Sequence, residues 1–420
     1  MIQFWSCWCA EVRRLFWLVV VTVLLLAAVP VSSLHAETII VPLGSVRSWY
    51  DTNVFRRPKP LLTNGEQPED FVTQVGAGLD ILHKTRDIDA DVKLGGFFTA
   101  YVENSQRNFF SATVRGHVGL DHWVDQYVRD ARLKIIQNLR YTPEQESFLT
   151  GARELQGDDG LVRGIEGFRA TQIRNTTEVK GVYPLSRDVS IEGGYIFGLR
   201  SIGRIQGGDV SNVAYFDTMV HTWSGGPRYK LTRNDSVAVL YQQSFITQSN
   251  SLGGRTFNAN LITVAGDYTK EFQEWGFTIQ GGVTFIEPGG RAFPSGRLEI
   301  NTSLERDTVV YLTLSREGRP SFFLAGGAII SNLARVGFSH RIYERLTLDG
   351  GVGYAYNELF PSTDRTFKNL TATSRLAYKL TRNITGELFY LYSNIDVDSS
   401  STQFQYSRSQ AGLMLTAEWK

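Results

Sequence analysis

The chain has 420 residues, with 43 basic and 42 acidic side chains, a formal net charge of +1 at pH 7, and two cysteines. This balanced charge gives no case for nucleic acid, or any other strongly charged macromolecule, as a partner. Forty glycines and 12% aromatic residues agree with many strands and turns, in a membrane barrel and in a soluble all-β protein alike.

The N-terminus has the three regions of a secretory signal peptide. Two arginines precede the apolar run 15–29, and a small-residue cleavage site ends at Ala36. We therefore expect residues 1–36 to be a signal peptide and residues 37–420 to form the mature domain. The alternative is a transmembrane anchor, but the run is short for about 30 Å of hydrocarbon. Both cysteines would leave with the signal, so disulfides and thiolate metal sites are not expected.

Apolar and polar residues alternate with a period of two in the stretch 71–102, and this stretch guides the interpretation of the remaining chain. From 71 to 83 the apolar residues hold the odd positions, and after the polar residues 84–87 they move to the even positions. This pattern predicts two long strands joined by a tight turn, each with one apolar and one polar face. Such lengths fit strands that span a membrane, which need about 9–11 residues or more.

Long strand, short polar turn, long strand and longer connection then repeat along the chain. Three turns share the pattern Leu-Ser/Thr-Arg-Asn/Asp, at 185–188, 231–234 and 380–383. Short turns on one side and longer loops on the other are typical of transmembrane barrels, with the short turns in the periplasm. After the apolar run near the N-terminus no stretch suits a transmembrane helix, so insertion requires strands that close into a barrel.

We therefore predict an all-β fold, an antiparallel transmembrane β-barrel of about 18 strands (16–18), with both chain ends on the periplasmic side. The predicted strands are residues 41–55, 71–83, 88–102, 111–122, 127–141, 171–183, 189–199, 213–229, 237–245, 257–269, 277–286, 296–304, 309–315, 328–340, 346–356, 367–380, 384–392 and 404–419.

The connection 142–168 stands apart because it has no period and contains several glycines and an acidic pair. A structureless loop of this length is usually functional or disordered. Two placements stay open: it folds into the barrel as a constriction, or it lies outside.

Aromatic residues near the predicted strand ends indicate girdles at the membrane interfaces. The alternative is ordinary strand packing in a soluble β protein. These residues are Trp123, Tyr127, Tyr183, Trp223, Tyr229, Trp275 and Tyr378.

The last strand places Leu413, Leu415 and Trp419 on one face. It resembles the C-terminal signal of bacterial outer-membrane barrels, which implies the barrel-assembly machinery as a partner. The usual pattern ends on the aromatic residue itself, whereas Lys420 follows it here.

The polar strand faces are predicted to line a lumen. One interpretation is a transport path whose charges set selectivity; the other is that opposite charges on neighbouring strands simply pair. The run Arg132, Lys134 and Arg140 is the best candidate for an anionic-solute patch, since Arg129 points to the other face. The full set of predicted lumen-lining residues is Arg115, His117, Arg132, Lys134, Arg140, Arg174 and Arg375.

A lipid-hydrolase activity is the competing function class, because some outer-membrane barrels are enzymes. It would need a serine and a histidine within reach of each other. Ser339 and His340 are adjacent and so face opposite sides of a strand, and His117 and His221, both predicted to face the lumen, lack a nucleophile elbow. We therefore expect no catalytic, metal-binding or cofactor-binding residues.

The stretch 49–55, Trp-Tyr-Asp-Thr-Asn-Val-Phe, resembles the opening of a family of outer-membrane β-barrels that accompany exopolysaccharide and exosortase (PEP-CTERM) systems in Gram-negative bacteria. The Leu-Ser/Thr-Arg turns, residues 141–144 (Tyr-Thr-Pro-Glu) and residues 315–321 (Ser-Arg-Glu-Gly-Arg-Pro-Ser) match as well. The resemblance implies an outer-membrane location near a polysaccharide synthesis or export locus, and no established catalytic residues.

The hypothesis from the sequence is a passive channel or accessory barrel for exopolysaccharide or capsule export. The alternatives are a general porin-like diffusion channel and a structural or adhesive barrel. The expected partners are outer-membrane lipid and polysaccharide or small polar solutes.

Overall fold

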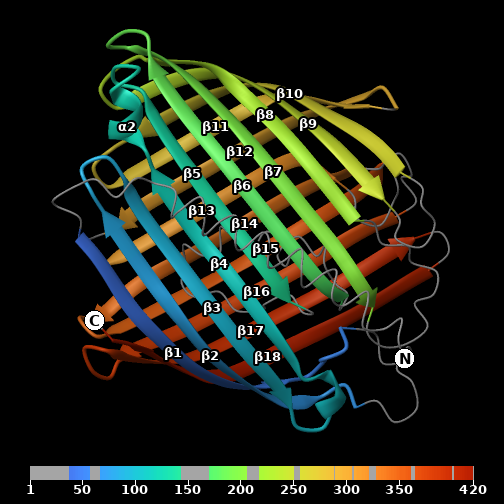
Figure 1. Cartoon of the computed structure of the whole chain (residues 1–420). Helices are drawn as coiled ribbons and strands as arrows, with labels where there is room; N and C mark the ends of the chain where they lie inside the picture. Colours follow the sequence, from blue (N-terminus) through green and yellow to red (C-terminus); the bar gives the residue numbers. More distant parts are fainter. Residues whose placement is uncertain are drawn as a thin grey trace, which may run out of the picture.

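Eighteen antiparallel strands form one closed sheet in the computed structural model. Each strand pairs with its neighbours in sequence, and the first strand pairs with the last, which closes the barrel. Figure 1 shows the blue-to-green strands on the near wall and the orange-to-red strands on the far wall. The predicted antiparallel barrel of about 18 strands is therefore confirmed.

The structure describes most of the barrel and not every connection. The predicted signal peptide and the connection after Thr142 lie outside the described residues. The described residues are 37–56, 67–142, 170–205, 217–249, 256–287, 289–304, 307–320, 328–360, 365–399 and 402–419.

Strand lengths run from 11 residues in β4 to 17 in β7, enough for tilted strands to span a bilayer. The strands are β1 (Glu37–Asp51), β2 (Asp70–Lys84), β3 (Asp89–Tyr101), β4 (Phe109–Gly119), β5 (Arg132–Thr142), β6 (Ala170–Pro184), β7 (Val189–Ile205), β8 (Asp217–Lys230), β9 (Asp235–Ser249), β10 (Thr256–Glu271), β11 (Trp275–Glu287), β12 (Arg291–Leu304), β13 (Thr308–Pro320), β14 (Ala328–Tyr343), β15 (Leu346–Phe360), β16 (Arg365–Lys379), β17 (Ile384–Ser399) and β18 (Thr402–Glu418).

Side chains alternate between an exposed apolar outer face and an inner face. On β2, Phe71 and Val75 are 49% and 52% exposed, whereas Val72 and Gln74 are buried. Cross-strand partners lie on the same face of a sheet, so the register carries this assignment from strand to strand around the barrel. The period of two in the sequence therefore separates a lipid-type surface from an interior.

Four of the short turns are built on one hydroxyl each. In the turn between β8 and β9, Thr232 Oγ1 accepts the backbone N–H groups of Asn234 and Asp235, both at 3.1 Å. Thr85 and Ser186 do the same in their turns, as does the threonine of the turn at 380–383. Such side-chain-to-backbone bonds favour turns over continued strand, which explains the repeated Ser/Thr.

The connection between β4 and β5 differs from the prediction of a strand from Tyr127. A short helix, α2 (Asp121–Asp125), is followed by turns, and β5 begins only at Arg132. Asp130 has a positive φ of 61°, and the Asp121 carboxylate accepts the N–H of Leu133 at 3.0 Å. Aspartates that bond to nearby backbone and tolerate left-handed geometry end the strand pattern here.

A single turn of 3-10 helix, η2 (Ser105–Arg107), connects β3 and β4. Within the described ranges, no helix is long and apolar enough to span a membrane.

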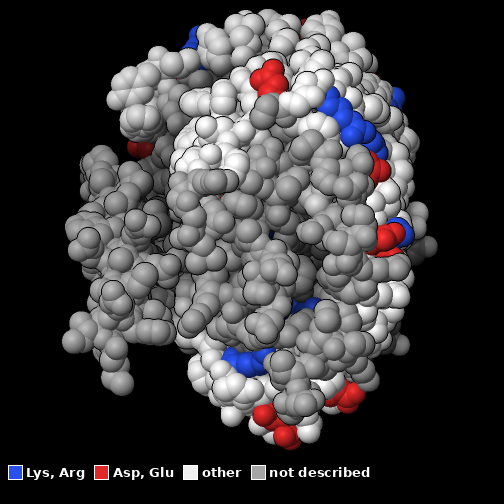
Figure 2. All heavy atoms as spheres, turned by 90° about the vertical axis from the view of Figure 1, so that its right-hand side faces the viewer, with Lys and Arg blue, Asp and Glu red and all other residues white. Residues whose placement is uncertain are grey.

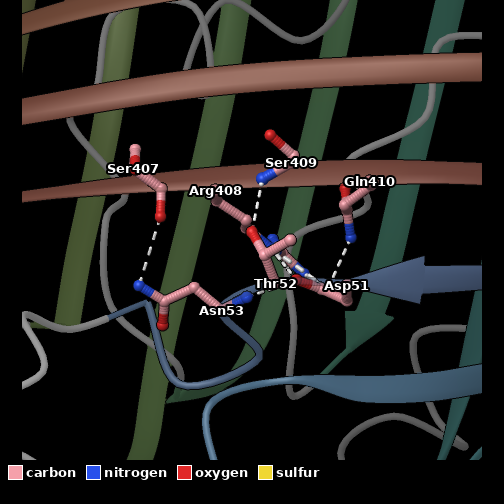
Figure 3. A network of polar contacts seen from close by, with 7 residues as sticks. All are labelled: Asp51, Thr52, Asn53, Ser407, Arg408, Ser409 and Gln410. Atoms are coloured by element: carbon pink, nitrogen blue, oxygen red, sulfur yellow. Dashed lines mark hydrogen bonds and ion pairs between the residues drawn. The ribbon is translucent and has the colours of Figure 1, made fainter.

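A buried ion pair joins the first and last strands (Figure 3). Arg408 Nε on β18 lies 2.9 and 3.1 Å from the two carboxylate oxygens of Asp51 on β1, and Gln410 donates to the same carboxylate at 2.7 Å. Beyond β1, the Asn53 side chain donates to the carbonyl of Ser407 at 3.3 Å. The Arg408 and Asp51 side chains are 4% and 1% exposed, so water competes little for these bonds.

The interior near the long loops holds three buried apolar clusters besides the Asp51–Arg408 pair, although the sequence predicted polar inner faces throughout. The clusters comprise Ile246, Ala259, Leu261, Ile286, Phe293, Ala328, Ile330 and Phe360; Ile329, Leu359, Phe367, Ile395, Val397 and Tyr406; and Trp49, Val54, Phe55, Val72 and Tyr101.

Replacing Arg408 with methionine should destabilise the barrel by about 3–5 kcal/mol, because Asp51 would remain buried without its cation. Urea unfolding of the refolded protein in lipid vesicles measures the loss. Arg297→Met is the control, because its pair with Glu299 is 45% and 26% exposed and should contribute no more than about 1 kcal/mol. Equal losses in the two variants would contradict the special role of the β1–β18 pair.

Candidate functional site

Basic side chains gather on the inner face of the wall formed by β3 to β6. Phe110 on β4 is 55% exposed, so the odd positions of that strand, including Arg115 and His117, face inward. The register pairs Lys93 with Arg115 and Lys134 with Lys180. Six of the predicted residues share this inner wall, namely Arg115, His117, Arg132, Lys134, Arg140 and Arg174.

Three of these side chains keep their charge uncompensated by direct pairing. Arg115, Arg132 and Lys134 are exposed, and none forms an ion pair within the part of the chain that the structure describes. Their neighbours Lys93 and Lys180 do pair, with Asp80 at 3.4 Å and Glu178 at 3.0 Å. The wall therefore offers unpaired positive charge to the interior.

Three arginines lie side by side further along the wall, towards the long loops. The register pairs Arg140 with Arg174 and Arg174 with Arg200. The Gln172 amide oxygen accepts from Arg174 Nε at 3.2 Å and from Arg200 Nη2 at 3.1 Å. All three arginines have further interactions, so this row belongs to a polar network and is not a free patch.

The predicted residue Arg375 lies on the far wall and is fully engaged. Its guanidinium binds both Glu387 carboxylate oxygens, at 2.7 and 2.6 Å, and Asp349 at 3.2 Å. The two acidic side chains are only 7% and 9% exposed. Here the alternative of simple charge pairing describes the geometry.

A second network of the same kind centres on Arg228, which is not among the predicted lumen-lining residues. Arg228 on β8 reaches Glu192 on β7 at 2.6 Å and Asp267 on β10 at 3.0 Å. All three residues occupy inward-facing positions of their strands, and this alternation is the only indication of the network that the sequence contains. The partners lie 36 and 39 residues away, and only the strand register brings them together.

The far-wall network borders a cavity of about 1060 Å³ at the short-turn end. Its lining includes Tyr311, Asp349, Arg375, Lys379 and Glu387. The interior therefore has a polar cavity near the short turns, whereas near the long loops it holds apolar clusters beside buried polar groups such as Asp51 and Arg408.

The rim in Figure 2, seen from the right-hand side of Figure 1, has few charged side chains among the described residues. They carry both signs and form no large patch of one sign.

The structure places His221 on the outer face, which corrects the prediction that it faces the lumen. It pairs in register with Phe197 and accompanies Trp223, which is 54% exposed. The Tyr195 hydroxyl lies 2.7 Å from His221 Nδ1. The alternation on β8 is weak because Gly225, Gly226 and Pro227 interrupt it, so the sequence left its parity open to error.

Trp223 also differs from the other predicted girdle residues, because it lies in the middle of β8. Tyr183, Tyr229, Trp275 and Tyr378 lie at strand ends beside the short turns and are 42–47% exposed.

The described residues contain no assembled serine–histidine catalytic site and no metal site. Ser339 and His340 pair in register with Asp349 and Leu348, which face the inside and the outside of the barrel. No group of three or more His, Cys, Asp or Glu side chains among the described residues could hold a metal ion.

Residues 300–418 match the family described as "Putative beta-barrel porin 2". No curated protein matches the sequence. Among solved structures, the outer membrane protein opdK from Pseudomonas aeruginosa aligns with a TM-score of 0.44 and 10% identity, over 91% of this chain and 99% of that chain.

Two further solved structures are similar at the same level. Acinetobacter baumannii OccAB3 aligns with a TM-score of 0.43 and 10% identity, over 91% of this chain and 99% of that chain. The ferric enterobactin receptor PfeA aligns with a TM-score of 0.43 and 8% identity, over 90% and 81%. The family match over the last strands supports a porin-like barrel of the outer-membrane type.

Replacing Arg375 with methionine should destabilise the barrel by about 3–5 kcal/mol, because two buried carboxylates lose their cation. Neutralising the whole network, as Asp349→Asn, Arg375→Met and Glu387→Gln together, should recover most of that loss. Urea midpoints of the refolded variants measure both effects. A triple variant no more stable than Arg375→Met would show that repulsion between stranded carboxylates is not the cause.

Proposed function

We propose that the protein is a passive channel in the bacterial outer membrane whose basic inner wall favours small anionic solutes. The observation that carries this proposal is the set of exposed, unpaired cations Arg115, Arg132 and Lys134 on one inner wall of a closed 18-strand barrel. Barrels of 16–18 strands are wide enough for an aqueous channel. The exposed apolar outer band and the porin-like family match support the membrane location.

The wall charges act on solutes that pass close to them. The Debye length is about 8–10 Å at physiological ionic strength, so their field reaches about that far from the wall. Arg132 and Arg140 lie eight residues apart on one strand, about 27 Å at 3.4 Å per residue. The three unpaired cations lie within this stretch, since Arg115 pairs in register with Asn138, so an anion moving along the wall meets several positive charges in succession.

Catalysis is not part of the proposal. Diffusion through a lumen requires charge, width and water, and no assembled nucleophile, cofactor or metal. The opposite faces of Ser339 and His340 in the register support this choice.

The association with exopolysaccharide or capsule export is a second, finer proposal that rests on the resemblance of residues 49–55 and 315–321 to barrels of such systems. Outer-membrane lipid and the barrel-assembly machinery are the proposed partners of the outer face and of β18. The exposed Leu413, Leu415 and Trp419 support the latter. A deletion strain that keeps normal surface polysaccharide but loses uptake of small anions would favour the general diffusion channel.

Refolded mature protein, residues 37–420, should give stable ohmic steps in a planar bilayer and prefer chloride over potassium in a salt gradient. Replacing Arg115, Arg132 and Lys134 together with glutamine should lower the chloride/potassium permeability ratio about three- to fivefold. Each charge contributes about 0.4 kcal/mol at 10 Å in water, and screening reduces this by about half or more at 0.1 M salt.

The matched control replaces Arg86, Arg187 and Arg233 with glutamine, which removes the same charge from exposed short turns. Its permeability ratio should stay near that of the wild type. Insertion without conductance would overturn the channel, and equal shifts in the two triple variants would overturn the role of the wall.

A further inference from the structure

Strands β12 and β13 separate before either strand ends. Their pairing stops at Gly296 and Arg316, while β12 begins at Arg291 and β13 continues to Pro320. Residues 291–295 pair only with β11, and residues 317–320 only with β14. The barrel wall therefore has a seam on the long-loop side of this last pair.

The outer face of the strands after the seam turns into the barrel. On the short-turn side, Leu314 and Val336 are 40% and 47% exposed. Further along the same face, Ile330 and Phe360 are 0% and 7% exposed and join a cluster with Phe293, whose side chain faces inward from β12. Strands β13 to β15 thus bend towards the barrel interior beyond the seam.

The bend leaves a groove of about 470 Å³ on the outer surface, directly below the seam. This volume lies within the range of ligand sites, about 300–1,000 Å³. Apolar and aromatic side chains line it. The outward-facing lining residues are Ile279, Gly296, Leu298, Leu314, Ala334, Tyr354 and Tyr356.

Arg316 places a positive charge at the seam end of this groove, with its guanidinium carbon 5.9 Å from the centre of the Phe293 ring that lies behind the seam. Its Nη1 donates to Asn332 Oδ1 at 2.6 Å, and its buried Nε has no hydrogen-bond partner among the described residues. Arginine and asparagine on a lipid-facing surface are costly unless a polar partner satisfies them. The groove therefore combines apolar walls with an unsatisfied cationic donor.

The height of Arg316 suits the headgroup region. It lies eight residues beyond Thr308, where β13 begins at the short turns, about 26 Å along the strand. A tilt of about 40° reduces this to about 20 Å of height, close to the limit of an apolar band about 25 Å tall.

We propose that this groove binds a phosphate-bearing lipid from the leaflet on the long-loop side, with an acyl chain against Gly296 and Ala334 and the phosphate on Arg316. Guanidinium groups bind phosphate oxygens through paired N–H donors. The site lies on the outer surface, so it does not depend on the proposed channel. The site also gives a role to Arg316. This residue lies in the sequence motif 315–321 and does not line the proposed channel.

Native mass spectrometry of the detergent-purified protein, expressed from the full-length chain, tests the proposal with two probes. Dioleoyl phosphatidic acid carries the phosphate, and dioleoylglycerol has the same chains without it. The wild type should retain one phosphatidic acid at about tenfold lower concentration than dioleoylglycerol, a preference typical of one charge-assisted bond pair. Arg316→Gln should abolish this preference, and Arg316→Lys should keep part of it.

Ala334→Phe should weaken retention of both probes by filling the groove. Ala77→Phe is its control, because Ala77 is an exposed outer-face alanine on β2, and retention should be unchanged. Ala334→Phe also keeps the proposal testable if Arg316→Gln fails to fold. Equal retention of the two probes by the wild type, or unchanged retention in folded Arg316→Gln or Ala334→Phe, would overturn the site.

Discussion

The need to satisfy every backbone hydrogen bond governs this structure. In hydrocarbon no water can pair with a free strand edge, so the sheet must close on itself. Closure brings together β1 and β18, which are the most distant strands in sequence. The buried bond between Asp51 and Arg408 joins the two strands at that junction. Asp51 lies inside the stretch 49–55, one of the stretches on which the family resemblance rests.

Closure also divides the side chains between an outer face and an interior. Charged side chains in the interior are either paired with opposite charges or unpaired. On the far wall and beside β8, arginines bridge pairs of carboxylates, as Arg375 and Arg228 show. On the wall from β3 to β6, Arg115, Arg132 and Lys134 have no such partners within the described residues. Paired charges stabilise the wall, and unpaired charges remain available to solutes. This difference is the physical basis of the proposed anion preference.

Local patterns in the sequence predicted the strands, the turns and most of the inner face. The period of two predicted 18 strands, and the Ser/Thr positions anticipated the turns around Thr85, Ser186 and Thr232. Contacts between distant partners were not predictable from local patterns. The Asp51–Arg408 pair, the Arg228 network and the apolar clusters near the long loops all require the register of strands far apart in sequence. The prediction that His221 faces the lumen was wrong because glycines and a proline interrupt the alternation on β8. Strand β5 begins at Arg132, later than predicted, because aspartates stabilise the turns before it.

The barrel requires a water-accessible inner face that alternates with a lipid-type outer face, and cysteine accessibility along β4 tests this alternation most directly. The only native cysteines lie at positions 7 and 9, so single cysteines can be placed cleanly in residues 37–420. In vesicles, a membrane-impermeant thiol reagent should label cysteine substitutions of Thr113, Arg115 and His117, and should spare those of Ala112, Val114 and Val118. Uniform labelling, or labelling of the second set alone, would contradict the inward orientation of these side chains and a water-accessible lumen.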